Sequence, residues 1–144
     1  MKKINRFFSS FIGLFILSGG LMIFSSQISA QDEPAYTVVE GQVDKRTFNG
    51  YRRFHGICHT CHGPDALGST IGPSLVDSLK NITYAEFKDV VLNGRTATNA
   101  QGQPSVMLAF SNNADIVKYL DDIYMYVKAR SDGVLGPGRP QKIK

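Results

Sequence analysis

The chain has 144 residues, of which 42% are hydrophobic and 19% are charged, and its formal net charge at neutral pH is +4. Three of the 16 basic residues, Lys2, Lys3 and Arg6, stand at the extreme N-terminus, and without them 13 basic residues face 12 acidic ones, a balance of +1. So small an excess of positive charge argues against a nucleic-acid-binding protein.

Residues 1–30 resemble an export signal. A basic start is followed by a mostly apolar stretch from 7 to 24, and Ile28-Ser29-Ala30 offers small residues for cleavage. The apolar stretch is also long enough for an uncleaved membrane anchor, although Ser18-Gly19-Gly20 interrupts it. We expect cleavage before Gln31, release into the periplasm and no stable membrane insertion.

Removal of 30 from 144 residues leaves 114, enough for one small domain. Residues 31–43 are polar and extended in character, and we expect an N-terminal arm without chemistry of its own. Asp44 is a suitable N-cap for a helix from about Lys45 to His55, ending in Gly56, because aromatic residues recur there every three to four positions. The interior Gly50 suggests a close helix crossing.

The next segment, Cys58-His59-Thr60-Cys61-His62, has the C-x-x-C-H pattern of covalent haem attachment. In that pattern both thiols add to haem vinyl groups, and the histidine that follows binds the iron from one side. In a domain this small, a buried porphyrin would form part of the core. We therefore expect one haem c, held by Cys58, Cys61 and His62.

Other sites also use a C-x-x-C pair. The pair forms small disulfides, thioredoxin-like redox centres and halves of zinc sites. A structural zinc site needs four ligands arranged as a tetrahedron. The cysteines and histidines of this chain all lie within His55–His62, so no second ligand pair elsewhere could complete such a site. A thioredoxin-like motif needs a βαβ pattern that the sequence lacks, so haem attachment is the favoured interpretation.

The rest of the chain alternates loops and helices. Residues 63–78 are rich in glycine and proline, and a capping box at Thr83–Glu86 starts a helix that stops at Asn93-Gly94. A long polar loop, 94–110, leads to the strongest predicted helix, Ala114–Arg130, and then to a Gly- and Pro-rich basic tail, 131–144. No convincing strand is found, so we predict an all-α fold.

The sixth iron ligand has several candidates in the sequence. Met125 stands beside the apolar stripe of the last helix, where packing is the commoner role. His55 is tied to the same side of the porphyrin as His62, and His59, between the two cysteines, faces away from the iron if His62 faces toward it. Met107 is on a loop long enough to pass round the porphyrin edge, so it is the preferred ligand; the alternative is a methionine that only covers an open or five-coordinate iron.

Several of these residues together resemble the class I cytochromes c. Gly50 and Phe54 stand where that family has the glycine and aromatic of its first helix, and Ile123 and Tyr126 resemble their partners in the last helix. The resemblance covers about residues 44–130. It implies three main helices around one covalently attached haem, and a protein that transfers electrons and is not an enzyme.

Two loops carry the same resemblance. Gly72-Pro73-Ser74-Leu75 is similar to the G-P-x-L loop, whose proline carbonyl accepts a hydrogen bond from the axial histidine, so Pro73 is implied as that partner of His62. Met107-Leu108-Ala109-Phe110 resembles the M-P-x-F segment that bears the axial methionine, with leucine in place of proline.

A narrower resemblance is to the cytochrome c-L-like carriers of methanol and alcohol oxidation. It rests on the stretches 50–55, 61–70, 122–133 and 138–140. It implies a PQQ-dependent alcohol dehydrogenase as electron donor, a downstream cytochrome or oxidase as acceptor, and a monomer that meets both in turn. The alternatives are a haem sensor or enzyme with an open axial site, and a fixed haem subunit of a dehydrogenase or oxidase complex.

Overall fold

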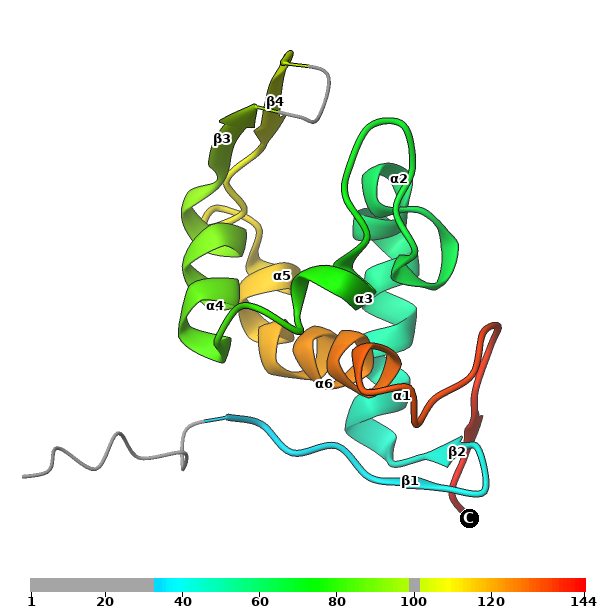
Figure 1. The fold of residues 1–144 in the computed structure, drawn as a ribbon. Helices are drawn as coiled ribbons and strands as arrows, with labels where there is room; N and C mark the ends of the chain where they lie inside the picture. Colours follow the sequence, from blue (N-terminus) through cyan, green and yellow to red (C-terminus); the bar gives the residue numbers. More distant parts are fainter. Residues whose placement is uncertain (1–32, 99–101) are drawn as a thin grey trace, which may run out of the picture.

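The computed structural model describes residues 33–98 and 102–144, so the predicted signal peptide lies outside the described residues. Helices predominate (Figure 1), and they are α1 (Lys45–Arg53), α2 (His59–His62), α3 (Leu75–Ser78), α4 (Tyr84–Asn93), α5 (Ala114–Lys118) and α6 (Leu120–Ser131). The predicted helical fold is confirmed in its main feature, but the described residues also contain five short strands, so the fold is not all-α: β1 (Val38–Val39), β2 (Gln42–Val43), β3 (Arg95–Thr98), β4 (Pro104–Met107) and β5 (Gln141–Lys142). Within the described residues, no helix is both long and apolar enough to cross a membrane.

The first helix begins as predicted and continues further than predicted. The Asp44 carboxylate accepts hydrogen bonds from the backbone N–H groups of Arg46 (2.8 Å) and Thr47 (3.0 Å), which caps α1. In place of a stop at Gly56, a π-helical turn, Phe54–Cys58, joins α1 to α2. Because this π-helical turn continues the helix where Gly56 was expected to end it, the C-x-x-C-H segment is helical and continuous with α1.

The predicted close crossing at Gly50 is confirmed. Figure 1 shows α6 lying across α1, and a Cβ atom on Gly50 would overlap the backbone carbonyl oxygen of Asp122. Four residues further along α1, the rings of Phe54 and Tyr126 lie 5.5 Å apart between centroids, and both residues are fully buried. This crossing fixes α1, and with it the start of the C-x-x-C-H segment, against the core.

The second predicted helix is confirmed, but the prediction of a loop after it is wrong. Thr83 and Glu86 form the capping box of α4, and Gly94 ends the helix with a positive φ of 76°. The region expected as a loop contains an antiparallel hairpin in which Arg95 of β3 is opposite Met107 of β4. β-branched residues at alternate positions of β3, and the apolar Met107 in β4, give this polar segment enough strand character to pair.

The last predicted helix is interrupted. Asn113 caps α5, but Tyr119 has a non-helical φ of −115°, so α5 and α6 are separate helices and α6 runs one residue beyond the predicted end, to Ser131. The guanidinium of Arg53 lies 4.1 Å from the centre of the Tyr119 ring and forms an ion pair with Asp115. The interruption between α5 and α6 therefore lies where Tyr119 contacts Arg53, the last residue of α1.

The predicted arm and tail meet. β1 pairs with β2 in antiparallel fashion, and β2 pairs in parallel with β5 near the C-terminus. Val43 in β2 and Leu135 before β5 are both buried, and the backbone N–H of Ile143 donates to the Val43 carbonyl (2.9 Å). Both segments therefore pack onto the domain, which extends the ordered structure beyond the predicted helical boundaries of 44 and 130.

Candidate haem site

One large cavity opens between two groups of elements. On one side are α4 and the β3–β4 hairpin, and on the other are α2 and the loop before α3 (Figure 1). Its volume is about 510 Å³, within the range of cavities that hold small molecules and cofactors. Most of the lining is apolar, including Phe54, Ile82, Phe87, Val91 and Ile123.

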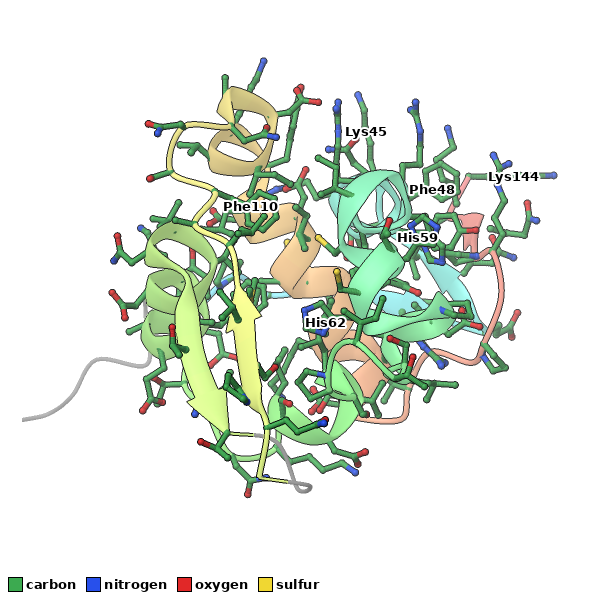
Figure 2. The ribbon with its side chains drawn as sticks, turned by 90° about the horizontal axis from the view of Figure 1, so that it is seen from above. Lys45, Phe48, His59, His62, Phe110 and Lys144 are labelled. Carbon is green, nitrogen blue, oxygen red and sulfur yellow. The ribbon has the colours of Figure 1, made fainter. Side chains whose placement is uncertain are left out.

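Four of the five site residues predicted from sequence line this cavity: Cys58, His62, Pro73 and Met107. Cys61 does not belong to the lining; it is exposed on α2, one turn from Cys58. Met107 is the last residue of β4, in the hairpin that lies across from α2, the helix that bears His62 (Figure 1). Figure 2 shows His62 in the interior of the molecule, between the hairpin and α2.

The orientation of His62 is set by a neighbouring loop. Its Nδ1 atom lies 2.9 Å from the carbonyl oxygen of Pro73, within hydrogen-bond distance, so Nδ1 is the protonated nitrogen that donates and Nε2 is the nitrogen left to bind a metal. Gly72 allows this approach, because a Cβ there would come 2.9 Å from the Cys61 carbonyl oxygen and 3.2 Å from His62 Nδ1. The imidazole is thus held in one orientation.

A serine that the sequence interpretation missed closes the same loop. The Ser69 hydroxyl donates to the carbonyl of Cys61 and accepts from the backbone N–H of Ile71 at 3.0 Å. Ser69 lines the cavity, as does Ile71, which is 66% exposed. No pattern around Ser69 distinguishes it from other loop serines, so only the folded arrangement reveals this contact.

No disulfide joins the two cysteines. Burial first, with an added contribution from the neighbouring Cys61, raises the pKa of the Cys58 thiol to about 11. Before haem attachment, the Cys58 thiol is therefore protonated at physiological pH and lies in the largely apolar cavity wall. Among residues 33–98 and 102–144, no three metal-binding side chains of the His, Cys, Asp and Glu types gather at one point.

The other candidate iron ligands lie elsewhere. Met125 is 2% exposed within α6 and does not line the cavity. His55 is placed between aromatic neighbours, with its ring centroid 4.2 Å from that of Tyr51 and 5.7 Å from that of His59, and its Nδ1 atom is bonded to the Tyr51 carbonyl. Neither His55 nor His59 lines the cavity.

The residues present fit a haem. The cavity is apolar over most of its surface, it has a thiol at its edge, and it has an oriented imidazole on one wall and a thioether sulfur on the opposite one. These are the donors that hold haem iron in electron carriers.

Comparison with known proteins finds two cytochromes that are similar to this chain. No protein-family model matches the chain. Cytochrome c-553I of Paracoccus denitrificans is 44% identical over 115 residues, which are 79% of this chain and 50% of that protein, so the chain spans half the length of this relative. Cytochrome c-555 of Methylococcus capsulatus is 37% identical over 116 residues, 80% of this chain and 85% of the relative.

A solved structure has the same fold. The c-type cytochrome XoxG from Methylobacterium extorquens AM1 superposes with a TM-score of 0.70 at 38% sequence identity, over 80% of this chain and 70% of that one.

Proposed function

Since the chain belongs to the c-type cytochromes, which carry covalent haem c and transfer electrons, we propose that it takes single electrons from a PQQ-dependent alcohol dehydrogenase and passes them to a downstream cytochrome or oxidase. The observation that carries this proposal is that His62, on α2, and Met107, on β4, both line one largely apolar cavity. A haem held by both residues would leave no open site for a substrate, and its iron would pass single electrons.

Each site residue has a separate task in this proposal. Cys58 and Cys61 would bind the haem covalently, and residues of α2, α3, α4, α5 and α6 line the cavity around it. The haem would supply an iron that alternates between the ferrous and ferric states. The Pro73 carbonyl accepts a hydrogen bond from Nδ1 of His62, which leaves Nε2 free to bind the iron, and the β3–β4 hairpin carries Met107, the second residue that would bind it.

The partner assignment rests on similarity. The relatives are bacterial c-type cytochromes, and the stretches quoted above resemble the carriers that serve PQQ-dependent alcohol dehydrogenases. The export signal expected in residues 1–30 agrees with a periplasmic location, where those dehydrogenases operate. Transient docking on two partners in turn favours a monomer.

Direct electron transfer from the donor tests the proposal. Reduced PQQ-dependent alcohol dehydrogenase, mixed with the oxidised cytochrome, should reduce the haem, and absorbance at the haem bands should follow the reaction in stopped flow. The same dehydrogenase prepared without PQQ is the control. If ascorbate reduces the cytochrome and the complete dehydrogenase does so no faster than the control, the donor assignment is wrong.

A further inference from the structure

Charge is nearly absent from the cavity wall. Among the described residues that line it, Arg95 is the one with an ionised side chain, and no aspartate or glutamate is present. A haem, however, brings its own negative charges, because its propionate groups are ionised at neutral pH. A carboxylate in so apolar a site is costly unless a cation or several hydrogen bonds meet it.

Arg95 is placed to meet such a group. It is the first residue of β3, directly across the ladder from Met107. Arg95 lines the cavity and is also exposed to solvent. Arginine also matches a carboxylate with two parallel hydrogen bonds, which a lysine cannot do.

Within the described residues, Arg95 has no hydrogen-bond or ion-pair partner, unlike four other cations. Arg46, Arg53, Lys80 and Lys128 each pair with an aspartate. An unpaired arginine on the wall of an apolar cavity is the feature to be explained.

Two carboxylates of α4 are near enough to compete. Glu86 and Asp89 line an open depression together with Arg95. Both are engaged: Glu86 accepts from the backbone N–H (2.7 Å) and hydroxyl (2.9 Å) of Thr83, and Asp89 accepts from the Asn93 side-chain amide at 2.7 Å. The facing strand, β4, contributes no charged side chain, and α2 contributes only His62 to the cavity.

We infer that the Arg95 guanidinium pairs with a propionate carboxylate of the haem; this rests on the haem filling the cavity as proposed above. The pair neutralises a negative charge close to the iron. Because ferric haem has one more positive charge than ferrous haem, a nearby cation favours the ferrous form. Arg95 therefore raises the reduction potential and keeps the propionate ionised to lower pH.

The test compares three variants of the haem-loaded protein. Arg95→Gln removes the charge, Arg95→Lys retains it, and Arg52→Gln removes an exposed cation of α1 that has no ion pair in the described part and does not line the cavity. Reduction potentials come from redox titration. Propionate titration comes from the pH dependence of haem proton resonances in NMR spectra of the oxidised protein.

In Arg95→Gln we expect a lower potential than in the wild type and a propionate that titrates at higher pH. Arg95→Lys should restore most of both properties, and Arg52→Gln should leave both unchanged. Each variant is first checked for covalent haem by its resistance to acid-acetone extraction. If the haem is covalently bound, a failure of the Arg95 inference can be distinguished from a failure of the proposed function. If Arg95→Gln leaves the propionate titration and the potential as in the wild type, Arg95 serves the carboxylates of α4 or the solvent, and the inference is overturned.

Discussion

Gly50 and Asp122 meet where α1 crosses α6, with no space for a side-chain atom between the glycine and the aspartate carbonyl oxygen. Gly50→Ala should therefore force the helices apart and cost about 3 kcal/mol of unfolding free energy, or more. Gly56→Ala is the matched control, because a Cβ there meets nothing within 4 Å and alanine favours helical backbone by about 1 kcal/mol. Denaturant unfolding followed by circular dichroism measures both, and equal stabilities would contradict the crossing.

Gly72 and His62 provide the second prediction. In Gly72→Ala the new methyl group presses on His62 Nδ1 and lengthens its hydrogen bond to Pro73. A weaker bond makes the imidazole a poorer electron donor to ferric iron, so the reduction potential should rise, on the order of 40 mV for a bond worth about 1 kcal/mol. Redox titration measures the shift.

Gly136→Ala, where a Cβ has no neighbour within 4 Å, is the control for that measurement and should show the wild-type potential. A potential that stays constant or falls in Gly72→Ala would mean that the Pro73 carbonyl does not tune the histidine.

Asp44 links stability to pH. Burial alone would raise the pKa of its carboxyl, but hydrogen bonds from Thr47, Thr37 and Arg46 outweigh burial and hold the pKa below its ordinary value of 3.8. A lowered pKa means that the cap stabilises the fold fully above that ordinary value, and that this contribution is lost as the pH falls through the lower folded-state pKa. Asp44→Ala should lose about 1 to 2 kcal/mol at neutral pH.

Asp44→Asn should retain most of the cap and lose its share of the acid sensitivity, which thermal unfolding across an acidic pH series would reveal. Glu40→Gln, at an exposed turn residue, should reproduce the wild-type pH profile. An Asp44→Asn profile as steep as that of the wild type would assign the acid sensitivity to other carboxyls.

A basic face gives the fourth prediction. It consists of Lys45, Arg52, Arg139, Lys142 and Lys144, all exposed and none in an ion pair within the described part of the chain. The Arg139 guanidinium and the Lys142 ammonium lie 5.5 and 5.4 Å from the centre of the Phe48 ring, and Figure 2 shows Lys45, Phe48 and Lys144 on one side of the molecule. Such a surface attracts an acidic partner.

The double variant Arg139→Glu with Lys142→Glu should slow reduction by an acidic partner about tenfold at low salt, and the difference should shrink as salt screens the charges. Lys80→Glu, which changes a cation already paired with Asp77 on α3, is the control. If the double variant reacts at the wild-type rate at low salt, these residues are only solvated charges.

The sequence could predict the features that depend on near neighbours. The cap at Asp44, the capping box at Thr83 and the stop at Gly94 are formed within a few residues, and the structure has all three. Gly50 could be assigned to a helix crossing because a glycine inside an amphipathic helix has few other uses.

The features that sequence missed depend on distant or weak contacts. β2 and β5 are separated by most of the chain, and neither has a pattern long enough to predict a strand. The β3–β4 hairpin is short and mostly polar, so its composition resembled a loop. Arg95 had no signal at all, since its role emerges only when the hairpin places it on the cavity wall.

The most direct test of the account concerns Met107 as the axial ligand opposite His62. The oxidised wild-type protein should show the near-infrared sulfur-to-iron charge-transfer band, Met107→Ala should lose it, and Met125→Leu, a change at the buried methionine of α6, should keep it. A band that persists in Met107→Ala, or that is absent from the wild type, would contradict a closed His/Met site and with it the proposed electron carrier.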